Sequence, residues 1–372
     1  MASADWRDEL ERWLEPFLAR LSHPARRQMC PVYVAGLIGP GERKSIEPIA
    51  QRQQSSYDQL HHFISAGIWD AAPLETELAV QADRLVGGPN AYLVIDDTAL
   101  PKKGCHSVGV APQYAGALGK TANCQALVSL TLSSGEVPVP VALRLFLPES
   151  WTADPGRLAA AGVPEDCRAF RTKAEIALAE LDRLLACGVR FGVALADAGY
   201  GMIPEFRHGL SDRALLWTVG IPCSQSAYAP LVELTWPTGA RGVPRRHPRP
   251  AEKPGRVDLM LKAERWRPIS WRRGTKGPLR ARFAARRVRI ADGARCRSID
   301  GSYQHLPGDE LWLIGERRAS GERKYYLSNL PPETPLRTLA ATVKARWICE
   351  QAHQQMKEEL GLDHFEGRSW TG

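Results

Sequence analysis

Two apolar segments that each end in an aspartate constrain the fold of this chain more than any other feature. Residues 91–95 form a continuous apolar run that ends at Asp96-Asp97-Thr98, and residues 188–196 form a second run that ends at Asp197. Apolar runs of this length predict strands that are buried on both faces of a sheet. We therefore expect a sheet that carries carboxylates at the C-terminal ends of two of its strands.

The order of the predicted elements around these strands indicates a mixed α/β fold. Strands are predicted over residues 91–95, 125–132 and 137–147, and together they fit an antiparallel meander. Thr172 and Glu175 match a T-x-x-E capping box, which predicts that a helix begins there and runs to about Cys187. The strand at 188–196, a short helix at 203–210 and a strand at 214–221 follow.

The regions on either side of this core have a different character. Apolar residues between Trp6 and Leu21 recur at helical spacing, and further short helices are predicted up to residue 85. Residues 222–330 are first rich in Pro and Arg and then alternate in short stretches, at 281–290, 310–315 and 324–328, as strands do. We predict four parts: a helical DNA-binding region at 1–85, the first part of the catalytic core at 86–221, a basic β-rich insertion at 222–330, and the last helix and C-terminal end of the core at 331–372.

Positive charge is concentrated in the insertion. The formal net charge of the 372 residues is +8, and residues 241–297 hold 19 Lys or Arg against 4 Asp or Glu. A local excess of this kind indicates a polyanionic partner such as double-stranded DNA. The candidate DNA contacts are therefore Arg245 and Arg246 in the insertion, and Arg43 and Lys44 between the small N-terminal helices. For the N-terminal pair, the alternative is that both are solvated charges on a helical packing subdomain. Three tryptophans of the insertion can stack on unpaired bases or pack in its core: Trp236, Trp266 and Trp271.

The cysteines and the hydropathy pattern argue against secreted, membrane and zinc-finger proteins. The eight cysteines are scattered, with no C-x-x-C pair and no histidine at zinc-finger spacing. We find no N-terminal signal region, and no apolar run approaches 18 residues. A soluble protein with reduced thiols, located in the cytoplasm, is the expectation.

A polar stripe near the end of the chain is the third element of the predicted site. Lys344–Lys357 contains neither Gly nor Pro and predicts one helix. Arg346, Glu350, His353 and Lys357 share one face at i, i+4, i+7 and i+11, and an apolar arc beside them suits docking on a core. The alternative is a solvated charged face, and His353 is either a DNA contact or a structural histidine.

Convergence of Asp96, Asp197 and Glu350 would place three like charges together, which requires a cation. Oxygen ligands suit Mg²⁺, and two such ions, with Mn²⁺ able to substitute, can promote in-line phosphoryl transfer. Arg346 and Lys357, on either side of Glu350, would hold substrate phosphates. Lys102 and Lys103 follow the first aspartate and either contact phosphate or form a solvated pair.

These residues carry a family resemblance. The chain resembles bacterial insertion-sequence transposases of the DDE superfamily, in the branch with a β-rich insertion between the second Asp and the Glu. Arg346, Glu350 and Lys357 match the signature Tyr-x2-Arg-x3-Glu-x6-Lys, whose first position is Val343 here. Three further stretches are similar to the family: Ile95-Asp96-Asp97-Thr98, Asp197-Ala198-Gly199-Tyr200-Gly201 and residues 361–370.

The resemblance implies an RNase H-like mixed sheet flanked by helices, and a metal-binding triad of Asp96, Asp197 and Glu350. Asp97 is the alternative to Asp96; we prefer Asp96 because the family pattern places Thr two residues later, and alternation sends the two side chains to opposite faces. It also implies Mg²⁺-dependent cleavage at transposon ends and strand transfer of the 3′-hydroxyl, by a homodimer on DNA. The alternatives are a catalytically silent, truncated DNA-binding derivative and an RNase H-like nuclease outside transposition.

Overall fold

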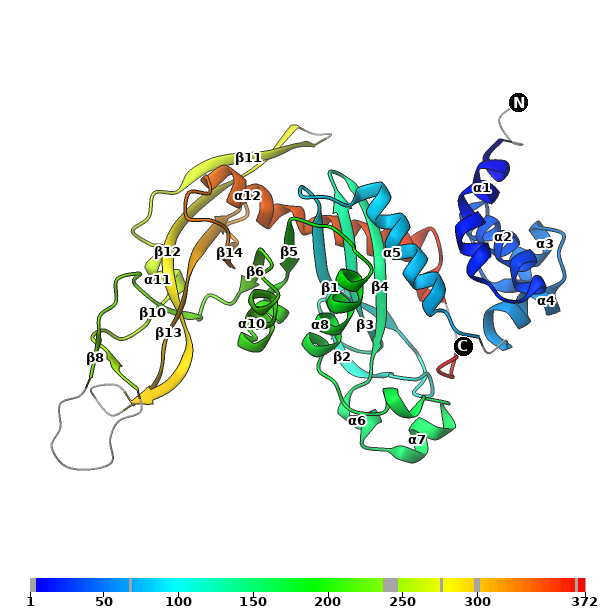
Figure 1. The fold of residues 1–372 in the computed structure, drawn as a ribbon, viewed down its shortest axis with the longest axis horizontal. Coiled ribbons are helices and arrows are strands. Elements are labelled where there is room, and N and C mark those ends of the chain that lie inside the picture. Colours follow the sequence, from blue (N-terminus) through cyan, green and yellow to red (C-terminus); the bar gives the residue numbers. More distant parts are fainter. Residues whose placement is uncertain are drawn as a thin grey trace. The chain divides into compact units, whose positions relative to one another are not determined.

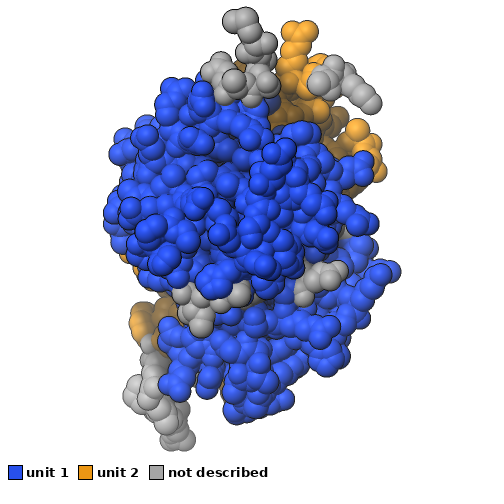
Figure 2. Space-filling view, turned by 90° about the vertical axis from the view of Figure 1, so that its right-hand side faces the viewer, with its two compact units in different colours: residues 1–191, 348–372 blue, residues 192–347 orange. Residues whose placement is uncertain are grey.

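The computed structural model describes residues 5–66, 69–236, 247–274, 277–297, 302–364 and 367–371. The chain forms two compact units (Figure 1, Figure 2): unit 1 combines residues 1–191 with 348–372, and unit 2 is residues 192–347. The predicted domain boundaries after residues 85, 221 and 330 differ from the limits of these units, which lie after residues 191 and 347. They stay predictions of functional organisation. Within the described ranges, no helix is both long enough and apolar enough to cross a membrane.

Unit 1 begins with the predicted helices. They are α1 (Asp5–Arg20), α2 (Pro24–Ile38), α3 (Ile46–Arg52), α4 (Tyr57–His61), the π-helical turn η1 (His62–Ala66) and α5 (Ala72–Val86). Leu21, Met29, Ile49, Leu60 and Phe63 form a buried cluster that holds these helices together. The helical expectation for this part of the chain is confirmed.

The sheet of unit 1 is antiparallel and centred on β3 (Lys120–Ser134). β1 (Tyr92–Pro101) pairs along one edge of β3, and β2 (Ala111–Ala115) and β4 (Val137–Phe146) pair along the other. The predicted meander is therefore confirmed, whereas β2 was missed because Pro112 interrupts a short segment that does not alternate. Helix α8 (Lys173–Ala186) begins with the predicted capping box at Thr172 and packs with α5 on β3 and β4 (Figure 1).

A small cluster of short helices follows β4 in unit 1. It contains the helices α6 (Glu149–Thr152) and α7 (Pro155–Ala160) and the turn η3 (Glu165–Cys167), whereas the 3₁₀ turn η2 (Gly116–Leu118) joins β2 to β3. Trp151 and Leu158 lie in the buried core beneath α6 and α7, and Trp370 packs against that core. The N–H of Trp370 donates to the Ala161 carbonyl, so the C-terminal segment, which follows the turn η4 (Leu362–His364), is attached to this cluster.

Unit 2 contains one long sheet. β5 (Val193–Ala196) and β6 (Trp217–Ile221) are parallel and are joined through α9 (Ala198–Gly201) and α10 (Pro204–Asp212). Next to β6 the order continues with β14 (Arg323–Ser328), β13 (Tyr303–Arg317), β12 (Gly277–Arg297), β7 (Ser226–Tyr228) and β10 (Gly255–Arg256), and β11 (Arg267–Gly274) also pairs with β12. A separate two-stranded sheet of β8 (Leu234–Thr235) and β9 (Arg249–Pro250), and the short α11 (Val257–Met260), complete the unit. The insertion is β-rich, as predicted, and its strands extend the sheet of β5 and β6.

The helix predicted over Lys344–Lys357 is two helices, which corrects the expectation of a single one. α12 (Leu336–Ala345) ends at Arg346, and α13 (Trp347–Glu358) follows directly. No Gly or Pro causes the break. Instead, α12 buries Leu339 and Val343 in a core of unit 2, whereas α13 buries its own apolar face in unit 1, so tertiary packing decides where the helix is interrupted.

Candidate active site

The two aspartates at the β1 site face opposite sides of the sheet. Asp96 Oδ2 accepts a hydrogen bond from the thiol of Cys349 on α13 at 3.1 Å, and Asp96 Oδ1 accepts the N–H of Asp97 at 2.8 Å. The Asp97 carboxylate instead receives the ammonium of Lys173 on α8 at 2.5 Å. Successive side chains of a strand alternate between faces, and here Asp96 faces α13, the helix that carries Glu350.

Helix α13 is attached to β1 and β3 by polar contacts one turn apart. Besides the Cys349 contact, His353 Nε2 lies 2.7 Å from Ser129 Oγ on β3, and the Lys357 ammonium donates to the Ala99 carbonyl on β1 at 2.9 Å. Cys349 and His353 are buried, while Glu350 is exposed in the first turn of α13. A carboxylate at this position is favoured by the positive end of the helix dipole.

Lys357 is half-buried, and this shifts its pKa. Burial disfavours the ammonium and lowers the pKa of Lys357 below its usual 10.5, although the negative charge of Asp363 partly opposes the shift. Because its partner at 2.9 Å is the neutral Ala99 carbonyl, the positive charge of Lys357 is not consumed by a close ion pair with that partner. A phosphate oxygen near Lys357 would therefore meet a cation whose charge is still available.

Asp197 occupies a different environment in unit 2. It is the N-cap of α9, where its Oδ1 accepts the N–H of Tyr200 at 3.2 Å. The glycines around it are explained by close packing of α9 on β6, because a Cβ on Gly201 would lie 1.9 Å from the Gly220 carbonyl oxygen. Such a clash with backbone cannot be relieved by a side-chain movement, so the turn after Asp197 requires glycine.

An ion pair within unit 2 supports the same turn. The guanidinium of Arg207 on α10 donates to the Gly201 carbonyl at 2.5 Å and to Asp292 Oδ2 on β12 at 2.7 Å. Both side chains of the pair are almost fully buried. A strand of the insertion is thereby connected, through Arg207, to the short helix that Asp197 caps.

The carboxylates suit a hard divalent cation by chemistry. The Asp96 carboxylate accepts hydrogen bonds at both oxygens, and carboxylate oxygens are ligands that Mg²⁺ prefers. In the part of the chain that the structure describes, however, no group of three or more His, Cys, Asp or Glu side chains is gathered closely enough to hold a metal ion. Asp96 and the helix of Glu350 belong to unit 1 and Asp197 to unit 2.

Comparison with known proteins decides the family. The model of a family described as DDE superfamily endonuclease matches residues 16–278, a range that includes Asp96 and Asp197 and ends before Glu350. This chain belongs to that family. Over 170 residues it is also 34% identical to a protein of Microchaete diplosiphon described as a probable transposase for insertion sequence element IS701. That alignment covers 45% of this chain and 41% of the relative, so the chain matches less than half of the relative's length.

One solved structure is similar in a broad sense. The cryo-EM structure of a piggyBac transposase synaptic complex with hairpin DNA aligns with 95% of this chain and 66% of that chain, with a TM-score of 0.38 and 11% sequence identity.

The predicted DNA contacts of this member of the DDE superfamily endonuclease family lie in varied surroundings. Arg43 and Lys103 are exposed, Lys102 and Arg346 are half-buried, and the Lys44 ammonium donates to the Gly39 carbonyl at 2.7 Å. His353 is buried against Ser129, which favours the structural role over the DNA contact. Arg245 and Arg246 lie outside the described residues. These DNA contacts stay predictions.

The tryptophans of the insertion divide between its core and its surface. Trp271 packs edge-on against Phe283, and Trp266 donates its indole N–H to the Leu261 carbonyl at 3.2 Å, so these two have the packing role. Trp236 is 62% exposed, and its aromatic face is available for stacking.

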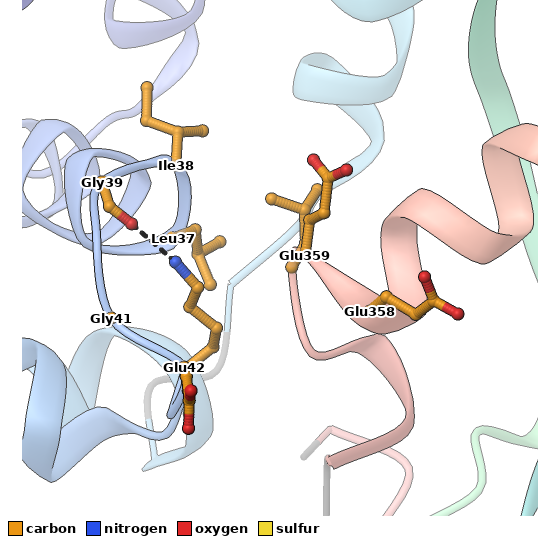
Figure 3. Close-up of a pocket in the computed structure, with 9 residues that line it drawn as sticks. Leu37, Ile38, Gly39, Gly41, Glu42, Glu358 and Glu359 are labelled. Carbon is orange, nitrogen blue, oxygen red and sulfur yellow. Dashed lines mark hydrogen bonds between the residues drawn. The ribbon is translucent and has the colours of Figure 1, made fainter.

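A surface pocket of unit 1 includes one predicted DNA contact, Lys44, and none of the three proposed metal ligands. It is lined by the end of α2, the loop that follows it and the end of α13: Leu37, Ile38, Gly39, Gly41, Glu42, Lys44, Glu358, Glu359 and Leu360. Figure 3 shows Glu358 and Glu359 on one side of the pocket and Glu42 on the other. Three carboxylates against the single ammonium of Lys44 leave the pocket itself negatively charged, so a DNA phosphate would meet Lys44 only from outside the pocket.

Sequence reasoning missed Cys349, Ser129 and Lys173, the residues that contact the first aspartate pair or its strand. Ser129 is one of several buried polar residues of β3, and a polar side chain at such a position usually has a hydrogen-bond partner. That pattern was the available signal for Ser129. Cys349 and Lys173 carried no comparable signal, because their partners lie 253 and 76 residues away in sequence.

Proposed function

We propose that this chain is a DDE transposase that hydrolyses phosphodiesters at transposon ends and directs the freed 3′-hydroxyl onto target DNA. Membership of the family supports endonuclease chemistry, and the partial match to a probable insertion-sequence transposase supports its use in transposition. The observation that carries the proposal is the contact between Asp96 and α13, because it brings the helix of Glu350 onto the strand of the first aspartate.

Each acidic residue has a distinct role in the proposal. Asp96, Asp197 and Glu350 hold two Mg²⁺ ions, for which Mn²⁺ can substitute. When bound, these ions supply activation of the attacking oxygen and stabilisation of the leaving oxygen. Asp96 is favoured over Asp97 because Asp97 is paired with Lys173 on the other face of the sheet.

Basic residues orient the DNA in this proposal. Lys357 and Arg346 hold phosphates near Glu350, and Lys102 and Lys103 extend the contact beside β1. Arg43 and Lys44 in the helical region, with Arg245 and Arg246 in the insertion, bind the duplex farther along. The protein acts in the bacterial cytoplasm on nucleoid DNA, as a homodimer on paired transposon ends.

The test is cleavage of supercoiled plasmid that carries the element's ends, with and without Mg²⁺ or Mn²⁺. The wild-type protein should nick or cut at the ends only with the metal. Asp96→Ala, Asp197→Ala and Glu350→Ala should abolish cleavage while DNA binding, measured by mobility shift, is kept. Full cleavage by any of these three variants would remove that residue from the site.

Asp97→Ala is the matched control for the first aspartate. It removes a carboxylate of the same strand whose partner is Lys173, and it should keep most of the cleavage. If Asp97→Ala is inactive and Asp96→Ala is active, the assignment is reversed. Specific binding by the wild-type protein without nicking would instead support a catalytically silent DNA-binding derivative, and cleavage that ignores the ends would support a general nuclease.

A further inference from the structure

We propose that Ser129 and His353 are a positioning pair that sets where α13 sits along β1 and β3, and therefore where Glu350 sits relative to Asp96. Neither residue would touch DNA or metal. The inference rests on the proposed function, since it assigns these two residues a role in arranging the carboxylates that the function requires.

The direction of the hydrogen bonds follows from the number of protons. The single hydroxyl proton of Ser129 is donated to the backbone carbonyl of Asp96 at 3.1 Å. The 2.7 Å contact between Ser129 Oγ and His353 Nε2 therefore has the imidazole N–H as its donor. The result is a continuous path of hydrogen bonds from α13, through Ser129, to the backbone of Asp96 itself.

The register of the strands puts this path at the first aspartate. Asp96 and Ser129 are directly opposite each other in the β1–β3 ladder. Ser129 is fully buried and His353 is 7% exposed, so water does not readily replace either partner. An unsatisfied polar group at such a position is costly, and this restricts α13 to positions that keep the pair.

The neighbouring contacts on α13 agree with one helix position. Cys349, His353 and Lys357 follow one another at intervals of four residues, and they contact Asp96, Ser129 and the Ala99 carbonyl, respectively. Residues four apart lie on one face of a helix. A slip of one turn, about 5.4 Å, would break all three contacts together. Glu350 directly follows Cys349, so its distance from Asp96 depends on the same placement.

The experiment compares Ser129→Ala, His353→Ala and His353→Gln with the wild-type protein. Each alanine variant should cleave transposon ends about 10- to 100-fold more slowly and need a higher Mg²⁺ concentration for half-maximal rate, as when the residues that orient metal ligands are removed. Affinity for end DNA should stay within about 2-fold of wild type, because neither residue is part of the proposed DNA surface. His353→Gln has an amide N–H that can reach Ser129, and it should restore part of the rate.

Thr131→Val is the matched control. Thr131 lies two residues from Ser129 on the same strand and is equally buried, but its hydroxyl has no hydrogen-bond partner in the described structure. Removal of this hydroxyl should leave the cleavage rate and its Mg²⁺ dependence unchanged. An equal loss in Thr131→Val and Ser129→Ala would show that any polar deletion in β3 slows cleavage, and it would overturn the assignment of a specific pair.

Two further readouts separate positioning from general destabilisation. Cys349 is fully buried on the face of α13 that packs on the sheet. Its rate of alkylation, followed by peptide mass spectrometry, therefore reports displacement of that helix. The alanine variants should be alkylated faster at Cys349 and at an unchanged rate at Cys187, which lies at the end of α8. The double variant Ser129→Ala/His353→Ala should be no slower than the worse single variant, since both deletions break one interaction.

The outcomes distinguish the pair from the proposed function. If the wild-type protein shows no metal-dependent cleavage, the proposed function fails, and the alkylation arm still decides whether the pair holds α13. If the wild-type protein cleaves and both alanine variants match its rate and Mg²⁺ dependence, the positioning role is refuted. Simple addition of the two single effects in the double variant would refute the pair as well. If His353→Ala does not fold, Ser129→Ala and His353→Gln decide the question alone.

Discussion

The first and second aspartates of the proposed site are held by different kinds of interaction. Around Asp96, a helix from the end of the chain is attached to two strands by single hydrogen bonds with no ion pair among them, and the partners are more than 200 residues apart. Around Asp197, the carboxylate caps α9 by accepting the N–H of Tyr200, three residues along the chain. Arg207, which forms a buried ion pair with Asp292, donates to the Gly201 carbonyl at the end of the same helix. The first arrangement depends on the docking of α13, and the second depends on buried charge.

This difference predicts how each region fails. Neutral hydrogen bonds each contribute about 1 kcal/mol, so a single deletion on the Asp96 side should shift a helix without unfolding unit 1. A buried charge that loses its partner costs several times more. Truncation of the buried ion pair on the Asp197 side should therefore reduce stability first, and truncation of the α13 contacts on the Asp96 side should reduce cleavage first.

Asp292→Ala should have the largest effect. It leaves the guanidinium of Arg207, whose side chain is 2% exposed, without its counter-charge, and we expect a loss of about 3–5 kcal/mol in the free energy of unfolding. Urea unfolding followed by circular dichroism measures it. Asp258→Ala, which breaks an ion pair with the exposed Arg256, is the control and should change stability far less. Equal losses in the two variants would mean that buried charge does not support the Asp197 region.

Glu316→Gln tests a second buried charge of unit 2 and should have the next largest effect. Glu316 is fully buried and accepts hydrogen bonds from Lys344 on α12, from Arg318 and from the Tyr326 hydroxyl. Loss of these charge-assisted bonds should cost about 1.5–3 kcal/mol near neutral pH. Glu322→Gln, at a half-exposed carboxylate that also pairs with Arg318, is the control and should cost less.

The pH dependence of the same variant checks the cause. Burial alone would raise the pKa of Glu316, but its hydrogen bonds to Lys344 and Tyr326 and the nearby positive charges lower it below 4.5. A carboxyl group with a depressed folded-state pKa stabilises the protein fully above its unfolded pKa, and this stability is lost as pH falls through the folded value. The stabilities of wild type and Glu316→Gln should therefore converge below pH 4.5. A constant difference across this range would contradict the prediction.

Two variants of Asp197 distinguish its role as a helix cap from its role in cleavage, and they should affect stability less than the changes to the buried charges. Asp197→Ala removes the acceptor for the Tyr200 N–H and should cost about 1 kcal/mol, as is typical for the loss of a helix N-cap. Asp197→Asn keeps an oxygen acceptor and should change stability by only a few tenths of a kcal/mol. Both variants should lose metal-dependent cleavage, because both lose the negative charge. Wild-type cleavage by Asp197→Asn would leave Asp197 with the capping role alone.

The same contrast between local and distant partners explains what the sequence predicted. The strand that ends before Asp197 was predictable because a buried strand has a continuous apolar sequence, and the apolar run at 91–95 located β1 in the same way. The predicted end of β1 at Asp96 was wrong, since β1 continues through Asp96 and Asp97 to Pro101 in its ladder with β3. The opposite directions of Asp96 and Asp97 followed from strand alternation, and their separate partners, Cys349 and Lys173, agree with it. The cap at Thr172 was equally local, since its two partners are three residues apart.

The missed features depend on partners far along the chain. Nothing in Lys344–Lys357 signals a break at Arg346, because the break arises where α12 leaves the core of unit 2 and α13 enters that of unit 1. Helical spacing placed His353 on the polar stripe, but spacing does not reveal that Ser129 on β3 is its hydrogen-bond partner. Apolar periodicity therefore located the elements of the site, whereas the polar contacts that hold α13 required the three-dimensional structure.

Lys357→Met should have a small effect on stability and completes the comparison on the Asp96 side. Lys357 donates to the Ala99 carbonyl, so its removal should cost about 0.5–1 kcal/mol near neutral pH, the net value of one hydrogen bond. Burial lowers the pKa of Lys357 below 10.5, so the unfolded chain binds this proton more tightly than the folded protein does. Stability should therefore rise with pH between the folded value and 10.5, and the rise should be absent in Lys357→Met and in Lys357→Arg, which stays charged. Urea unfolding over this alkaline range measures it, and an equal rise in all three proteins would assign it to another group. Lys344 on α12 neutralises a buried carboxylate, whereas Lys357 on α13 has a carbonyl as its partner, so we expect Lys357 to be the lysine whose charge remains available for a phosphate.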